Sequence, residues 1–181
     1  METSKFADLL ADQIANEFAA SQQYAAIAVW FDGEALPKLA SHFYAQALEE
    51  RNHAMMMVQY LLDADHPATI PGVLAPKVSF ADAREPIALA LQQERRVSEQ
   101  IQSLARTARD EGDYIGEQFM NWFLKEQVEE VASMSDLLKI VDRAGDNLFH
   151  VEDYVAREMA ATGSIDPTAP SAAGGLASST A

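Results

Sequence analysis

The sequence predicts an all-α protein: a four-helix bundle of two antiparallel hairpins joined by a long crossover, followed by a short fifth helix. Three observations support this fold class. Long stretches rich in Ala, Leu, Glu and Gln, all strong helix formers, fill most of the 181 residues. The prolines lie between these stretches or in a first helical turn, where proline is tolerated. The stretches are separated by two short corners and one long connection.

The first hairpin is expected from helices over about 4–32 and 37–64. Asp32-Gly33 ends the first helix, and Pro37 suits the first turn of the second. The crossover at 66–76 holds three prolines and therefore cannot be helical throughout.

The second hairpin is expected from helices over about 83–109 and 113–142. Asp110-Glu111-Gly112-Asp113 makes a tight corner between them. A fifth helix over about 147–160 has an apolar stripe at Leu148, Val151, Val155 and Met159. We expect residues 1–160 to form one domain and residues 161–181, rich in Ala, Ser and Gly, to form a flexible tail.

Composition limits the function classes. The net charge is −15, from 13 basic and 28 acidic residues, so nucleic acid is a poor partner and cations are better ones. Acidity that only maintains solubility is the alternative. With no cysteine, thiolate metal sites and iron–sulfur clusters are excluded. No apolar run is long enough for a membrane helix and no secretory pattern is present, so we expect a cytoplasmic protein.

A polar residue interrupts the apolar seam of every long helix near its midpoint. Each seam recurs at alternating steps of four and three residues. Antiparallel helices of similar length have their midpoints at one level, so the interruptions should converge on one slice of the core. They are Glu17, Glu50, His53, Glu94, Gln127 and Glu130.

Such a slice indicates bound metal. Unpaired buried carboxylates are unfavourable, and no Lys or Arg occupies the centre of any seam. Two divalent or trivalent cations would resolve the imbalance. One glutamate or histidine on an apolar stripe is more often an ordinary core residue, so the argument depends on the coincidence across four helices. Carboxylate, imidazole and amide ligands suit iron or manganese as well as zinc.

Spacing supports this interpretation. Glu50 and His53 are three residues apart, so both can clasp one metal ion while Glu50 bridges to a second. Gln127 and Glu130 have the same spacing. Tyr24 lies seven residues after Glu17 on the same face, where it is either a hydrogen-bond or electron donor to the site or an ordinary core tyrosine.

The chain resembles the ferritins, specifically their bacterial non-haem branch, over about residues 5–160. Four motifs, one from each long helix, carry the resemblance. They are Asn16-Glu17-Phe18 through Gln22-Gln23-Tyr24, Glu49-Glu50-Arg51-Asn52-His53-Ala54, Gln93-Glu94, and Asn121-Trp122-Phe123 through Glu126-Gln127-Val128-Glu129-Glu130.

The resemblance assigns roles to these residues. It implies Glu17, Glu50 and His53 as ligands of a first iron, with Gln127 nearby. Glu50, Glu94 and Glu130 would bind a second iron. A third position toward the shell interior matches Glu49, Glu126, Glu129 and Glu130, for which a solvated acidic face is the alternative. Trp122 matches an aromatic side chain that the family has near the site. Its role would be electron donation, core packing, or both.

Departures from related families narrow the resemblance. Bacterioferritins repeat Glu-x-x-His where this chain has Gln127-x-x-Glu130, and they place a haem-ligating methionine where it has Arg51. We therefore expect no haem at that position. Rubrerythrins carry a cysteine-ligated iron, which a chain without cysteine cannot hold.

The resemblance implies an iron-storage subunit. It would oxidise Fe(II) to Fe(III) at a di-iron ferroxidase centre, with O2 or peroxide as acceptor. A homo-oligomeric, 24-subunit hollow shell would then store ferric oxyhydroxide. Two alternatives stay open: a di-iron enzyme that acts on an organic substrate, and a structural or binding bundle with an inert metal.

Overall fold

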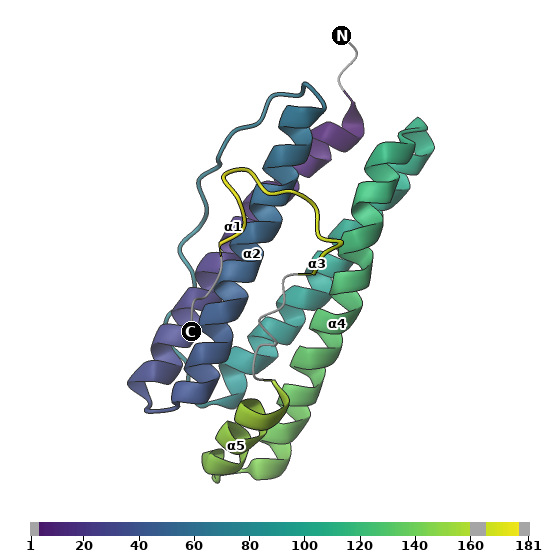
Figure 1. Cartoon of the computed structure of the whole chain (residues 1–181). Helices are drawn as coiled ribbons and strands as arrows, with labels where there is room; N and C mark the ends of the chain where they lie inside the picture. The colour runs from purple at the N-terminus through teal and green to yellow at the C-terminus, as the bar shows by residue number, and fades with distance from the viewer. Residues whose placement is uncertain (1–3, 160–165, 178–181) are drawn as a thin grey trace.

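The computed structural model describes residues 4–159 and 166–177, which contain five helices and no strand. Helices α1 (Lys5–Gly33) and α2 (Pro37–Asp63) form one antiparallel hairpin, and α3 (Arg84–Glu111) and α4 (Tyr114–Ala144) form the other (Figure 1). The short α5 (Leu148–Glu158) packs against α4 and α2 at one end of the bundle. The predicted all-α bundle with a fifth helix is confirmed.

The second hairpin has longer helices than its sequence predicts. α3 continues to Glu111 rather than to 109, because its end is set by Gly112, whose backbone φ of 73° stops the helix in the left-handed region. α4 continues to Ala144 rather than 142, up to Gly145. The fifth helix ends at Glu158, and residue 160, its expected end, lies outside the described residues.

The corner between α3 and α4 needs a second glycine. Asp113 caps α4 by accepting a 2.8 Å hydrogen bond from the Gly116 amide. A Cβ atom on Gly116 would lie 2.5 Å from an Asp113 carboxylate oxygen and 2.6 Å from the Phe6 ring. Glycine therefore lets the start of α1 approach the start of α4.

Carboxylates from distant elements cap the first helix of the bundle and its neighbour α2. Glu111 accepts hydrogen bonds from the Lys5 and Phe6 amides at 2.9 and 3.1 Å, and the Phe6 bond is the main cause of a lowered pKa for this carboxyl. Glu152 of α5 accepts from the Lys38 and Leu39 amides at 2.9 and 2.8 Å. Because the first amides of a helix have no partners within it, these bonds tie α3 to α1 and α5 to α2.

The apolar core is divided into two clusters. One contains Phe6, Leu10, Met57, Ile101 and Phe123, and the other contains Tyr24, Phe43, Ile87, Leu137 and Val155. On each long helix, the residues of the two clusters flank the buried polar residues identified from the seams. We call the set between the clusters the midplane layer: Glu17, Glu50, His53, Glu94, Gln127 and Glu130.

The C-terminal segment, residues 166–177, lies across the bundle beside α2 and α4 (Figure 1). The Ala173 amide donates to the Met55 carbonyl at 3.0 Å, and the Asn52 side chain exchanges two 2.9 Å hydrogen bonds with the Ala177 backbone. The expected flexible tail spans 161–181, of which 161–165 and 178–181 lie outside the described residues. In the described part, the chain contacts the bundle rather than extending from it.

In the part of the chain that the structure describes, none of the helices combines the length and the apolar composition that crossing a bilayer requires.

Replacing Glu152 tests the cap on α2. Glu152→Ala removes both hydrogen bonds to the first α2 amides and should lower the free energy of unfolding by about 1 kcal/mol per subunit, as lost caps do. Thermal unfolding measures the loss, and amide exchange at Lys38 and Leu39 should accelerate. Asp153→Ala, an exposed neighbour on the same helix, is the control and should change neither quantity. Equal losses in both variants would contradict the assignment.

Candidate metal centre

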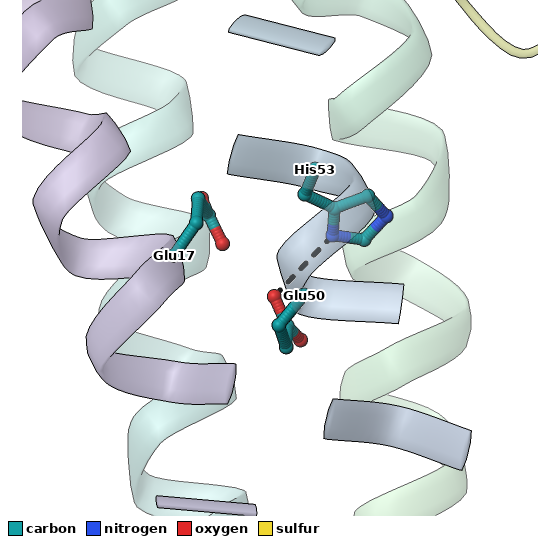
Figure 2. Close-up of side chains that lie close together, drawn as sticks. All are labelled: Glu17, Glu50 and His53. Carbon is teal, nitrogen blue, oxygen red and sulfur yellow. Dashed lines mark hydrogen bonds and ion pairs between the residues drawn. The ribbon is translucent and has the colours of Figure 1, made fainter. Parts of the chain in front are cut away.

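The tightest group of metal-binding side chains among the described residues is Glu17, Glu50 and His53. One ligand atom from each lies within 4.8 Å of the others, and all three side chains are buried. Glu17 extends from α1 toward Glu50 and His53 on α2 (Figure 2). The His53 Nδ1 lies 3.3 Å from a Glu50 carboxylate oxygen. The three residues expected at the first iron position are therefore adjacent.

Aromatic side chains of α4 hold the His53 ring. Trp122 and Phe123 contact it edge-on, with centroids 5.7 and 5.5 Å away. Two edge contacts restrict rotation of the ring, which keeps Nδ1 directed at Glu50. Trp122 thus packs against the site.

Glu94 and Glu130 complete the buried carboxylates of the midplane layer. Glu94 is fully buried, and the Tyr24 hydroxyl donates to it. Burial raises the pKa of Glu94 to about 7, against the opposing effect of the Tyr24 hydrogen bond. Burial, followed by the charge of Glu94, also raises the pKa of Tyr24, so the hydroxyl keeps its proton and stays a donor.

The charges of these residues are coupled through Glu50. Burial raises the pKa of Glu50, and the charges of Glu94, Glu17 and Glu130 raise it further. Glu50 therefore lies within electrostatic reach of the carboxylates on the three other long helices. Burial and then Glu49 and Glu94 raise the pKa of Glu130.

The layer has a surplus of acceptors. Within residues 4–159 and 166–177, no Lys or Arg forms an ion pair with any of its four glutamates. The Oε2 atoms of Glu17 and Glu94 are buried and have no hydrogen-bond partner among the described residues. Buried acceptors without donors are rare, and a metal cation satisfies them. The donor set fits a hard cation such as iron.

Gln127 adjoins this group from α4. Its side chain lowers the pKa of the Glu94 carboxyl, which burial raises, and its carbonyl oxygen accepts a 2.9 Å hydrogen bond from the Ser98 hydroxyl. Gln127 and Ser98 also line a groove of 560 Å³ between α3 and α4. The side chain thus lies between Glu94 and the surface.

The acids expected at a third position lie beside Glu130. The charge of Glu49 contributes to the raised pKa of both Glu130 and Glu126, and Glu129 contributes to that of Glu126. Glu49 and Glu126 are half-buried, while Glu129 is exposed. These acids are neighbours, but they do not join the tight group formed by Glu17, Glu50 and His53.

Two contacts at the site were not foreseen from the sequence. Gln13, which is buried, donates to Glu17 from one helical turn earlier. Asp166, in the C-terminal segment, accepts a 3.1 Å hydrogen bond from the Trp122 indole and is itself bonded by Thr168. The four-residue step from Gln13 to Glu17 is a signal that the sequence offers; the Asp166 contact spans 44 residues and offers none.

Comparisons with known proteins agree with this fold. The sequence-family model described as the ferritin-like domain matches residues 7–144 of this chain. Ferritin BfrB of Mycolicibacterium smegmatis is 67% identical over 172 residues, covering 95% of this chain and 94% of that protein. Bacterioferritin BfrB of Mycobacterium tuberculosis is 58% identical, with the same coverage, and the bacterial non-heme ferritin of Staphylococcus aureus is 35% identical over 81% of this chain and 89% of its own.

A solved structure gives the same result for the fold alone. An open pore ferritin from the archaeon Archaeoglobus fulgidus aligns with a TM-score of 0.82 at 24% identity, covering 86% of this chain and 96% of that one.

Metal binding should compete with protons at Glu94. Below its pKa of about 7 this carboxyl keeps a proton that a metal must displace, so the affinity for Zn²⁺ should rise with pH through neutrality, by up to about tenfold per pH unit for each proton released. Calorimetric titration between about pH 6 and pH 8 measures this slope. Glu94→Gln should bind more weakly and with a shallower slope. Exposed Glu99→Gln, on the same helix, is the control; an unchanged slope in Glu94→Gln would contradict the assignment.

Asp166 should restrain Trp122. In a Trp30→Phe background, which leaves Trp122 as the single tryptophan, Asp166→Ala removes the acceptor of the indole N–H. The anisotropy decay of Trp122 fluorescence should then gain a fast component, because the ring can rotate more freely. Asp136→Ala, which removes an exposed ion pair elsewhere on α4, should leave the decay unchanged. A slow decay in both variants would show that packing alone holds the indole.

Proposed function

This chain belongs to the ferritin family, and from that premise we propose that it is an iron-storage subunit with ferroxidase activity. It oxidises Fe(II) to Fe(III) at the midplane layer, and the product is stored as ferric oxyhydroxide mineral inside a hollow shell. One observation carries the proposal: Glu17, Glu50 and His53 converge in the core with buried acceptor atoms that no described cation satisfies.

The ligands divide between two iron positions. Glu17, Glu50 and His53 would bind one Fe(II), and Glu50, Glu94 and Glu130 would bind the other. The position of Glu50 supports its role as the shared ligand, because its pKa responds to the charges of Glu17, Glu94 and Glu130. Gln127, next to Glu94, would orient a water molecule or a carboxylate rather than bind as an anion.

The chemistry follows from the ligand type. Anionic oxygens are hard ligands that stabilise Fe(III) relative to Fe(II), so the site favours oxidation. Each of two Fe(II) ions gives up one electron, and O2 or peroxide accepts the pair. Trp122, packed edge-on against His53, is suitably placed to donate a further electron. Tyr24 orients Glu94 by hydrogen bonding.

Fe(III) would leave the core by way of the neighbouring acids. We assign a third iron position to Glu49, Glu126, Glu129 and Glu130. In addition to burial, the charges of Glu129 and Glu49 raise the pKa of Glu126, and those of Glu49 and Glu126 raise the pKa of Glu130. The exposure of Glu129 gives this position contact with solvent, where ferric ions hydrolyse and join the mineral.

The remaining assignments rest on the family. Subunits would assemble into a 24-subunit cytoplasmic shell without nucleic-acid or membrane partners, and the net charge of −15 would draw Fe(II) toward it. Arg51 follows Glu50 in place of a haem-ligating methionine, which supports a non-haem protein.

Iron oxidation by purified protein tests the proposal. Fe(II) is added in air and formation of Fe(III) is followed by absorbance, while the particle mass is measured by light scattering. Glu50→Ala and Glu94→Gln should each slow the initial rate about tenfold or more, because each removes a ligand of the proposed pair. Glu99→Gln, an exposed glutamate on the helix that carries Glu94, should oxidise iron at the original rate.

The same measurements separate the alternatives. Unchanged oxidation rates in both ligand variants would remove the site from the reaction. A particle of one or two subunits would exclude a storage shell and favour a di-iron enzyme with an organic substrate. Stoichiometric metal binding without oxidation would favour an inert structural metal.

A further inference from the structure

We propose that Gln13 is a positioning residue for the ferroxidase centre: its amide holds one oxygen of Glu17 so that the other oxygen faces the iron. This inference deepens the proposed function and rests on it. Gln13 directly precedes Ile14, a fully buried residue of the apolar core, so helical periodicity alone does not single it out.

The contact between the two side chains is buried and local. Gln13 is 2% exposed, Glu17 is 1% exposed, and the Gln13 Nε2 donates to the Glu17 Oε1 at 2.8 Å. The residues are one helical turn apart on α1, so the helix itself sets the distance between them. Because the helix already places both side chains, they need to move little when a metal ion binds.

The neighbours of Gln13 fix which way its amide points. The Asn16 Nδ2 donates to the Gln13 carbonyl oxygen at 3.0 Å, and the Gln100 carbonyl oxygen on α3 lies 3.4 Å from the Gln13 Nε2. A flipped amide would turn its oxygen toward the carboxylate of Glu17, and acceptor would meet acceptor. The NH₂ group therefore faces Glu17.

This bond leaves Glu17 with one free oxygen. Its Oε2 is buried and has no hydrogen-bond partner among the described residues. Glu94 shows the same arrangement from α3: the Tyr24 hydroxyl donates to its Oε1, and its Oε2 has no hydrogen-bond partner in the described part of the chain. Two carboxylates on the neighbouring helices α1 and α3 thus each have one oxygen held by a donor from α1 and one oxygen that no described residue satisfies.

Both donors are neutral, and that property matters for a cation site. A lysine or arginine in place of Gln13 would orient Glu17 equally well but would cancel its charge. An amide orients the carboxylate and preserves the negative potential that binds metal. The amide chain also continues outward, because Asn16 and Gln100 line a 370 Å³ cavity between α1, α3 and residues 72–76.

Cobalt binding to the intact assembled protein tests the role of Gln13 without iron oxidation. Gln13→Met removes the donor with little change in volume, and Gln13→Asn keeps an amide that is too short to reach Glu17. Calorimetry gives the affinity and stoichiometry for Co²⁺, and the visible absorption of bound Co²⁺ reports its coordination. Each variant should bind one Co²⁺ per subunit about tenfold more weakly, with an altered spectrum. Thermal unfolding of the metal-free variants provides the measure of structural damage.

Two further variants complete the experiment. Gln23→Leu removes a glutamine of the same helix that bonds the Lys77 backbone, and it should match the wild type in affinity and spectrum. Glu17→Ala should lose one bound Co²⁺ per subunit. If Glu17→Ala loses that ion while both Gln13 variants bind as the wild type does, the positioning role is overturned and the proposed function stands. If Glu17→Ala loses nothing, the proposed metal centre itself is wrong.

Discussion

The four glutamates buried at the middle of the bundle impose one electrostatic constraint on the whole molecule. Buried carboxylates either keep their protons or require cations nearby. The raised pKa values of Glu50, Glu94 and Glu130 correspond to the first case. A bound cation would correspond to the second. The unsatisfied oxygens of Glu17 and Glu94 show that no described hydrogen bond fully compensates this group.

The rest of the fold supplies the stability and geometry that such a layer needs. Two apolar clusters enclose it from both ends, and the caps by Glu111 and Glu152 attach elements that the hairpins alone would leave loosely joined. Trp122 and Phe123 fix the His53 ring, and the C-terminal segment in turn bonds Trp122. The orientation of the candidate metal-binding side chains therefore depends on packing contributed by four helices and a segment from the far end of the chain.

Sequence alone predicts the fold and the midplane layer well, because both follow from helical periodicity. Glu17 and Glu94 interrupt apolar seams, and any antiparallel bundle brings such interruptions to one level. The predicted helix ends at about 109 and 142 fall short of Glu111 and Ala144, since the backbone stays helical until a glycine stops it. The sequence does not single out Gln13, because a glutamine beside an apolar seam usually faces solvent. The contacts of Asp166 depend on tertiary packing, which the small and polar residues of the C-terminal segment do not indicate.

The division of the core into two clusters has a consequence for how the molecule opens. Helical bundles usually fray from their ends, where amides lack partners. In the middle of this bundle, between the two clusters, buried acids with raised pKa values take the place of aliphatic contacts. Filling that cross-section with cations would join two separately cohesive halves into one cooperative unit. A metal-free subunit and a metal-bound one would then share one backbone fold but differ in how cooperatively the two halves of the bundle unfold.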